Sequence, residues 1–302
     1  MLIFSWALNA LLVILTVAFF TLFERKIIGL IHLRVGPNKV SFLGLLQPLV
    51  DAIKLLRKQH LTSIQSNKIV YVLTPISSLV VSLLFWLLLP QPFFTFSISY
   101  SILAYLVLGS ILVLLALLSG WSSNSKYTFI GRLRSIAQSV SYEAIFTTLV
   151  ILSCILSQSY RILSIRRSFS LILFFTLIPL WGFSLLAETH RAPFDFSESE
   201  SELVSGYNTE YGRANFAWLF LAEYSALLFG CGVMYILFVP LPATLILSPL
   251  FMALFILIIS YIFTLIRVSY CRFRYDYLIS FAWKSLLPFC LIFLTLSYLF
   301  LL

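Results

Sequence analysis

Residues 216–239 read FAWLFLAEYSALLFGCGVMYILFV, a run in which Glu223 is the one charged residue. A helix of about 20 apolar residues is long enough to cross the hydrocarbon core of a membrane. A carboxyl group near the centre of that core costs roughly 2.5 kcal/mol or more, so we expect it to have a use. This stretch therefore predicts a transmembrane helix that carries a functional acid.

The rest of the sequence predicts seven further spans of the same kind. They cover residues 2–23, 69–89, 98–118, 137–156, 169–187, 245–266 and 281–300. Hydrophobic residues make up 61% of the 302 positions and charged residues only 10%, which excludes a soluble domain of this size. No basic residue precedes the first run, so we expect a retained span there and not a cleaved signal peptide. The prediction is an all-α polytopic membrane protein, with eight transmembrane helices in a single domain covering residues 1–302.

The basic residues predict how the spans are oriented. Of the 20 lysines and arginines, 17 belong to the odd-numbered loops, if Lys284 in the first turn of the last span is counted with the seventh loop. The positive-inside rule then puts these loops on the cytoplasmic side, or on the matrix side in an organelle, with both termini on the opposite side. The net charge of +9 is explained by this topology, so we expect no nucleic-acid binding.

The first loop predicts a turn followed by a helix that lies on the membrane surface. Gly36-Pro37-Asn38 is a turn sequence that would hold Arg34 in place relative to Arg25. Residues 44–58 are amphipathic and too short to span, which is typical of an interfacial helix. For Arg25 and Arg34 a functional role and a purely topological one stay open, as they do for Asp51, which could simply pair with Lys54.

Acidic residues are concentrated around the fifth loop. Seven of the 11 carboxylates lie between Glu188 and Glu223. If Pro193 opens a helix, Asp195, Glu198 and Glu202 share one face of it, and like charges so placed titrate as a coupled set. A solvated acidic loop is the simpler alternative, but it explains less well why the acids stand between two spans.

A further acid, Glu143, follows Tyr142 early in the fourth predicted span. Burial disfavours the charged form of a carboxyl group, so an acid in this position could exchange a proton near neutral pH. We therefore treat Glu143 as a functional residue by default.

The sequence predicts no redox centre and no metal site on this chain. Its four cysteines are too far apart to form a zinc or iron–sulfur motif, and its three histidines lie in predicted loops, so no intramembrane pair could hold haem. The glycine-rich patterns that bind nucleotide phosphates are also missing from the sequence.

Short motifs spread over nearly the whole chain carry a family resemblance. In chain order they are ERK (24–26), RVGPN (34–38), GLLQP (44–48), DAIK (51–54), AQ (137–138), SYE (141–143), AET (187–189), RAPFD (191–195), ESELVSG (200–206), LAEY (221–224), RYD (274–276) and WK (283–284). Together they resemble the NADH dehydrogenase subunit 1 family, the membrane subunit of respiratory complex I that helps to build its quinone chamber. Gln59, Ser199 and Cys271 depart from the family pattern.

The resemblance implies a function and a location. Electrons from NADH would pass through flavin and iron–sulfur clusters on other subunits to the substrate ubiquinone, and its reduction would be coupled to proton translocation. The implied partners are other complex I membrane subunits, membrane lipid, and the peripheral-arm subunits that carry the terminal iron–sulfur cluster and the quinone pocket. The implied location is the mitochondrial inner membrane, with the odd loops in the matrix and both termini on the intermembrane-space side.

The resemblance also assigns candidate residues. Those implied along the quinone channel are Arg25, Arg34, Asp51, Arg134, Phe220 and Arg274. Those implied for the coupling path are Tyr142, Glu143, Glu188, Asp195, Glu198, Glu202 and Glu223. Two alternatives use the same sequence differently: a stand-alone cation or proton transporter, which would run as a small oligomer on a native gel, and a structural scaffold, in which neutralising the acids would leave turnover intact.

Overall fold

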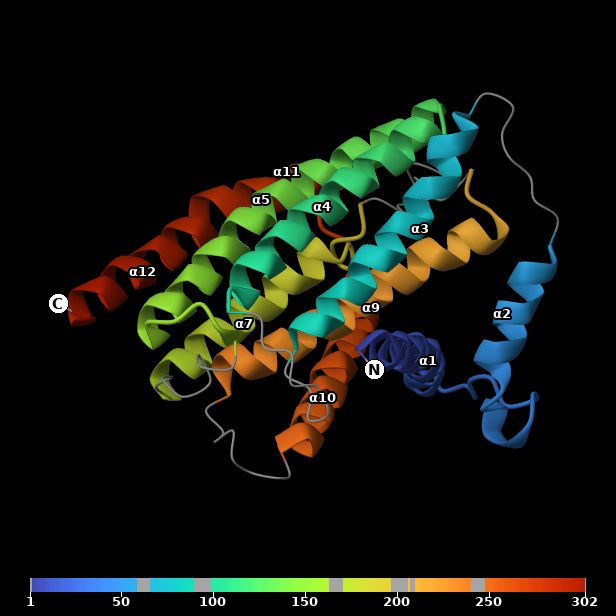
Figure 1. The fold of residues 1–302 in the computed structure, drawn as a ribbon, viewed down its shortest axis with the longest axis horizontal. Coiled ribbons are helices and arrows are strands. Elements are labelled where there is room, and N and C mark those ends of the chain that lie inside the picture. Colours follow the sequence, from blue (N-terminus) through green and yellow to red (C-terminus); the bar gives the residue numbers. More distant parts are fainter. Residues whose placement is uncertain are drawn as a thin grey trace.

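The computed structural model describes residues 2–58, 66–89, 99–162, 171–196, 206, 210–239 and 248–301, and the secondary structure in these ranges is helical. Helices α3 (Lys68–Phe85), α4 (Ser101–Ser122), α5 (Lys126–Ser157) and α12 (Leu287–Leu301) pack side by side in that order (Figure 1). Helix α9 (Arg213–Phe238) packs against α3 and against α7 (Leu171–Glu188), which in turn packs on α5. Helices α1 (Leu2–Ile31) and α10 (Ser248–Ser269) contact each other and α9.

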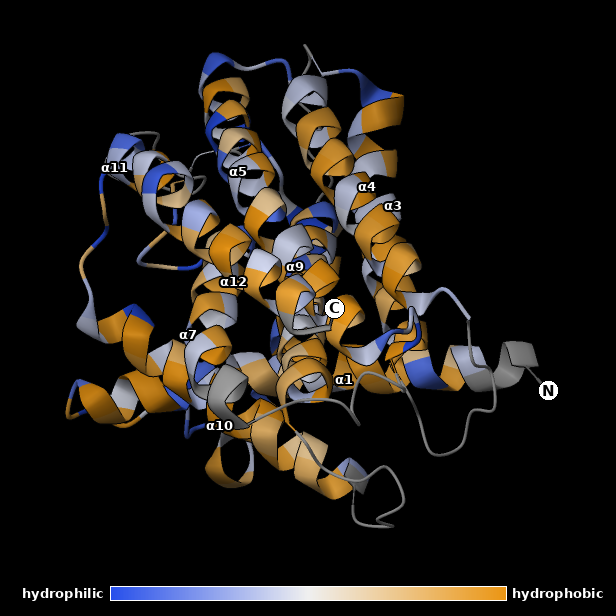
Figure 2. Cartoon of the chain, turned by 90° about the vertical axis from the view of Figure 1, so that its left-hand side faces the viewer, coloured by the Kyte–Doolittle hydropathy of each residue, from blue (hydrophilic) through white to orange (hydrophobic). Residues whose placement is uncertain are grey.

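The all-α membrane fold predicted from the sequence is confirmed. Within the described residues, seven helices are long and apolar enough to cross a membrane, and α7 contributes a shorter apolar helix over Thr176–Glu188. The predicted number of eight is therefore not confirmed. Figure 2 shows apolar residues along most of each long helix, with many of the polar ones near the helix ends.

Helix α9 is the centre of the bundle and its most buried span. Close packing around it involves large aromatic side chains. Trp181 of α7 is 0% exposed, and its ring centroid lies 4.0 Å from that of Phe146 and 5.5 Å from that of Phe238. Gly230 lies where a Cβ atom would come within 2.3 Å of Leu185, so it lets α7 approach α9 closely.

Two helices are longer than the sequence predicted. Helix α1 continues to Ile31, so Glu24, Arg25 and Lys26 are helical and do not begin the first loop. Helix α5 begins at Lys126 and already includes Arg132 and Arg134, which were expected in a loop. The three charged residues of α1 have partners on other parts of the chain: Glu24 pairs with Arg267, Arg25 pairs with Asp51, and Lys26 donates a hydrogen bond to the carbonyl oxygen of Leu43.

The predicted interfacial helix is present as α2 (Gln47–Arg57), with Pro48 in its first turn. Its apolar side chains Leu49, Ile53 and Leu56 are about half exposed, as expected for a helix whose apolar face meets lipid. The predicted pairing of Asp51 with Lys54 is replaced by a contact with α1. Arg25 donates a hydrogen bond of 2.7 Å to Asp51, because the lengthened α1 brings this guanidinium beside α2.

The last span also begins earlier than predicted. Helix α11 (Tyr275–Phe281), the π-helical turn η4 (Ala282–Leu286) and α12 follow one another without a break. Asp276 therefore lies in a helical first turn, where a negative charge is favoured.

Replacing Trp181 by alanine should destabilise the fold. The substitution leaves a cavity between Phe146 and Phe238, and large-to-small changes of this kind cost about 3–5 kcal/mol. The measurement is the midpoint of thermal unfolding of the detergent-solubilised protein. Trp283, which is 54% exposed, is the matched control, and we expect a much smaller change from Trp283→Ala. Equal effects of the two substitutions would contradict this account of the core.

Candidate functional site

A cavity of about 120 Å³, with a mainly apolar wall and several polar side chains, lies among α3, α4, α5, α7 and α9. Much of its wall is apolar and includes Phe85, Leu112 and Phe229. The polar side chains that line it are Ser78, Tyr105, Arg132, Ser135, Ser139, Glu188, Thr189, His190 and Glu223. Such a group of hydroxyl, carboxyl and basic side chains inside a membrane bundle can hold water and move protons, because each member can donate or accept a hydrogen bond.

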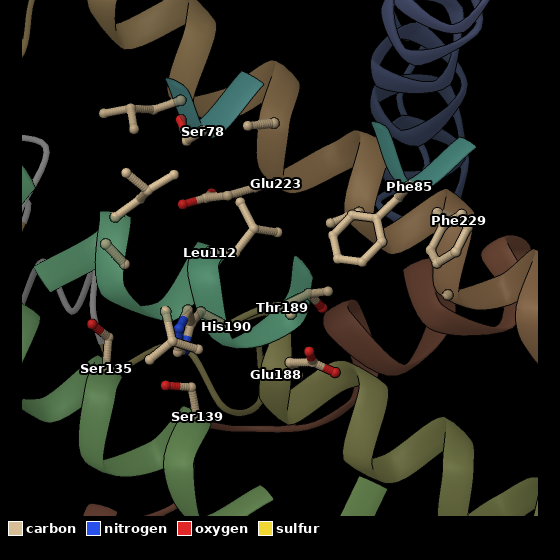
Figure 3. Close-up of a pocket in the computed structure, with 18 of the residues that line it drawn as sticks. Ser78, Phe85, Leu112, Ser135, Ser139, Glu188, Thr189, His190, Glu223 and Phe229 are labelled. Atoms are coloured by element: carbon tan, nitrogen blue, oxygen red, sulfur yellow. The ribbon is translucent and has the colours of Figure 1, made fainter. Parts of the chain in front are cut away.

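Two predicted acids line this cavity. Glu188 is the last residue of α7, and Glu223 lies within the span of α9. Figure 3 shows the two carboxyl groups entering the cavity from different sides, with His190 between the helices that carry them. A third predicted acid, Glu143 of α5, lies close enough to Glu188 for the two negative charges to repel each other. The structure thus brings together three acids that are 45 and 35 positions apart in the sequence.

The turn after α7 positions Glu188. The Gln138 side chain of α5 donates hydrogen bonds of 2.8 Å and 3.0 Å to the carbonyl oxygens of Ala187 and Phe194. His190 adopts a positive φ of 51°, which reverses the chain at the end of the helix. One glutamine therefore fixes the carbonyl before Glu188 and the carbonyl before Asp195.

The predicted helix opened by Pro193 is wrong for the part that the structure describes. Residues 191–196 form turns and bends, because the Gln138 side chain and the loop before α11 supply the hydrogen bonds that a helix would have supplied. Asp195 faces Arg272 at 3.9 Å and not the cavity lining. Glu198 and Glu202 lie outside the described residues, so their shared face remains a prediction.

Tyr142 and Glu143 stand side by side on α5, near its middle and not in its first two turns. The Tyr142 side chain is fully buried, and its hydroxyl donates to the carbonyl oxygen of Leu278 at 3.3 Å. Tyr142 therefore joins α5 to α11, and its place in the coupling path stays a prediction. Glu143 is partly exposed, and its charge acts on Glu188.

A second buried polar cluster lies beside the cavity and was not selected from the sequence. Glu24 is 6% exposed. Its carboxylate accepts a hydrogen bond of 2.7 Å from the Tyr224 hydroxyl and forms an ion pair with Arg267. The Arg191 guanidinium lies 3.8 Å above the centre of the Tyr224 ring, a cation–π contact. The sequence signal was weak, because these four residues come from α1, α9, α10 and the turn after α7.

The residues assigned to the quinone channel fall into two groups. Arg25 and Asp51 form one group with Gln47, whose side chain donates to Asp51 at 2.9 Å. The ring centroid of Phe220 lies 6.4 Å from that of Tyr224, whose hydroxyl group binds Glu24. Arg34 lies in the turn after α1.

The second group is at the start of α11. Arg274 pairs with Asp276 at 3.3 Å, and both side chains are exposed. The charge of Arg134 acts on the neighbouring Tyr275. The structure does not connect Arg274 to Arg25 by any contact between described residues. No group of three or more metal-binding side chains occurs in the part of the chain that is described.

The side chain of His190 is held neutral. Burial, with the nearby charges of Arg132 and Arg191, lowers its pKa to about 3. At neutral pH it can therefore take part in the cavity as a hydrogen-bond donor or acceptor without adding a charge.

Removing Arg267, the ion-pair partner of the buried Glu24 carboxylate, should lower the stability of the fold. Arg267→Leu leaves the Glu24 carboxylate with the Tyr224 hydroxyl and the charge of Arg191 as its neighbours. We expect a loss of roughly 2–3 kcal/mol, less than for a fully buried pair because the Arg267 side chain is 37% exposed. Denaturant unfolding of the solubilised protein measures it. The control Arg274→Leu breaks an exposed pair and should change stability by less than about 1 kcal/mol. A loss no larger for Arg267→Leu than for the control would refute this reading.

His190 should make the fold sensitive to acid. Between its unfolded pKa of 6.5 and its folded pKa of about 3, the unfolded chain binds a proton that the folded chain does not. Stability therefore falls as the pH falls through this window, by up to about 1.4 kcal/mol per pH unit. His190→Asn should flatten this dependence between pH 6.5 and pH 4, while His32→Asn, in an exposed turn, should not. Unfolding curves at several pH values test this, and an unchanged slope in His190→Asn would exclude it.

Comparison with known proteins gives one family. The sequence model described as NADH dehydrogenase matches residues 5–298 of this chain. Among similar proteins, "NADH-ubiquinone oxidoreductase chain 1" of Aedes aegypti is 42% identical, over 95% of this chain and 90% of the relative. The protein of the same name from Anopheles gambiae is 43% identical with the same coverage, and that from Lampetra fluviatilis is 41% identical, over 97% of this chain and 94% of the relative.

Proposed function

This chain belongs to the NADH dehydrogenase family as a subunit of NADH:ubiquinone oxidoreductase, respiratory complex I, and on that premise we propose that its cavity passes protons when ubiquinone is reduced. Its partners are accordingly other complex I subunits, and it is a multi-pass protein of the inner membrane. The observation that carries the proposal is the meeting of Glu188 and Glu223 in one cavity inside the helix bundle.

The energetic argument starts from the cost of these acids. A carboxyl group inside a membrane is unfavourable by several kcal/mol unless it is protonated or paired. In our proposal this cost is accepted because the two acids exchange a proton with water or with each other. Glu143, near the middle of α5, is the third acid, and its charge acts on Glu188. In our proposal these three acids form the coupling path, and Tyr142 holds α5 in place. Asp195, Glu198 and Glu202 form the end of the path in the fifth loop.

In our proposal the quinone site lies on the side of the chain that faces the matrix. Arg25 of α1 pairs with Asp51 of α2, and we assign Arg34 and Phe220 to the same site as a further cation and an aromatic wall. Cationic and aromatic side chains suit the polar head and the ring of ubiquinone, which is the substrate here. Arg134 and Arg274 would approach the same substrate from the other side of the loop. Flavin and iron–sulfur clusters are assigned to partner subunits of the peripheral arm.

The two regions are joined by buried residues. Glu24 precedes Arg25 in α1, and its carboxylate is bound by Tyr224, which follows Glu223 in α9. A change of charge at the quinone side therefore reaches the cavity acids through one ion-paired carboxylate. The orientation, with odd loops in the matrix and both termini in the intermembrane space, and the single domain of residues 1–302 are part of the same proposal.

The proposal predicts that Glu188→Gln and Glu143→Gln lower NADH:quinone turnover by about tenfold or more, because each removes a proton-exchanging group. Electron entry, measured with ferricyanide as a hydrophilic acceptor, should stay at the wild-type rate. The matched control is Glu210→Gln, which removes an acid that precedes α9 and does not line the cavity, and both rates should be kept.

A native gel of the same membranes reports assembly. The proposal requires each variant chain to run within the large complex. Wild-type quinone turnover in both Glu188→Gln and Glu143→Gln would exclude the coupling role. Migration of the chain as a small oligomer that transports cations alone would favour the transporter alternative.

A further inference from the structure

Tyr105 of α4 belongs to the cavity wall and has no part in the coupling path proposed above. Its side chain is 8% exposed and lines the cavity together with Glu188. The negative charges of Glu188 and of Glu143 both act on its hydroxyl group. Tyr105 therefore lies within electrostatic reach of two acids that we assign to the path.

Aromatic side chains from three other helices hold the Tyr105 ring in place. Its centroid lies 5.7 Å from that of Phe85 on α3, 6.1 Å from that of Phe146 on α5 and 5.6 Å from that of Phe229 on α9. Tilted and edge-to-face contacts at such distances favour one orientation of a ring. Phe146 follows Glu143 by three positions, so both lie on the same side of α5. The ring contact therefore places Tyr105 against the side of α5 that carries Glu143.

The hydroxyl group of Tyr105 is available to water. It forms no hydrogen bond with another residue in the part of the chain that the structure describes, and it belongs to a residue of the cavity wall. A cavity needs about 10–15 Å³ to hold one water molecule, so a cavity of about 120 Å³ has room for several. A tyrosine hydroxyl both donates and accepts hydrogen bonds, so it can join a chain of such water molecules.

Glu143 needs a link of this kind because it does not line the cavity. Among the described residues of the cavity wall, Glu188 is present and Glu143 is not. The charge of Glu143 acts on Glu188, but no hydrogen bond joins these two residues within the described ranges. A proton that passes from one to the other therefore needs a group that both can reach, and Tyr105 is a wall residue on which both act.

We propose that Tyr105 is a further residue of the proton path, whose hydroxyl group links Glu143 to Glu188 through water held in the cavity. The hydroxyl oxygen accepts the proton that leaves one carboxylic acid, and the hydrogen of the hydroxyl passes as a proton to the carboxylate of the other acid. The first acid becomes a carboxylate, the second becomes a carboxylic acid, and the hydroxyl group is restored. This inference rests on the proposed function, because it assumes that the two acids exchange protons.

The first test is Tyr105→Phe, studied in inner-membrane vesicles that contain the intact complex. This change keeps the ring with its three aromatic contacts and removes the hydroxyl group alone. We expect NADH:quinone turnover to fall about three- to tenfold, less than for the loss of a carboxyl group, because water can partly replace a hydroxyl group. The ratio of turnover in H₂O to turnover in D₂O should rise, because proton transfer then limits more of the rate. Ferricyanide reduction and migration within the large complex should stay unchanged.

The matched control is Tyr235→Phe. It removes the hydroxyl group of a tyrosine on α9 that is 2% exposed and does not line the cavity, so the rate and the isotope ratio should stay at their wild-type values. Wild-type values of both in Tyr105→Phe, or equal changes in Tyr235→Phe, would overturn the inference. Lower turnover with an unchanged isotope ratio, or loss of assembly, would indicate a structural role alone and would overturn it as well.

The second test combines Tyr105→Phe with Glu143→Gln. Two residues that serve the same step show non-additive effects when both are replaced. Once Glu143 is neutral, we expect loss of the Tyr105 hydroxyl to lower turnover by less than about twofold further. A reduction by the same factor with and without the Glu143 carboxyl group would contradict a shared step.

The single variants of the two acids separate this inference from the proposed function. Wild-type turnover in both Glu188→Gln and Glu143→Gln would remove the proposed function and the inference with it. Reduced turnover in these two variants, together with wild-type turnover and isotope ratio in Tyr105→Phe, would remove only the role of Tyr105.

Discussion

The buried carboxylate of Glu24 is the contact on which the arrangement of helices around the site depends. A charge in the membrane interior needs partners, and Glu24 finds them in Tyr224 of α9 and Arg267 of α10. This contact holds α1 against α9 and α10. Arg191, in the turn after α7, stacks on the Tyr224 ring and so joins that turn to the same cluster. This position of α1 places Arg25 beside Asp51 at the membrane surface. On α9, Glu223 lines the cavity one residue before Tyr224.

The membrane fold could be read from the sequence with little loss, because hydrophobic length alone identifies a span. The ends of the helices could not. Helix α1 passes through Glu24, Arg25 and Lys26, which have partners elsewhere in the chain, and α5 passes through Arg132 and Arg134. A single-sequence pattern has no access to such partners. The same limitation explains the turn at Pro193, which is set by Gln138 of α5 and not by local propensity.

The site was predicted in parts and not as a whole. Glu188 and Glu223 were selected because carboxyl groups are costly inside a membrane, and the structure brings them into one cavity. Family resemblance selected Tyr142, which packs against α11, and assigned Arg25 and Arg274 to one quinone channel; these assignments stay predictions. Gln138 belongs to a family motif but received no role from the sequence, because its contacts with the carbonyl oxygens of Ala187 and Phe194 exist only where α5 meets the turn after α7.

The most direct test of the account measures quinone reduction and proton translocation together, in proteoliposomes that contain the complete complex. Glu223→Gln removes one cavity acid without touching the Arg25–Asp51 contact at the membrane surface. If the cavity is part of the coupling path, proton translocation and quinone reduction should fall together, while ferricyanide reduction continues. Quinone reduction and proton translocation both at wild-type rates in this variant would contradict the account.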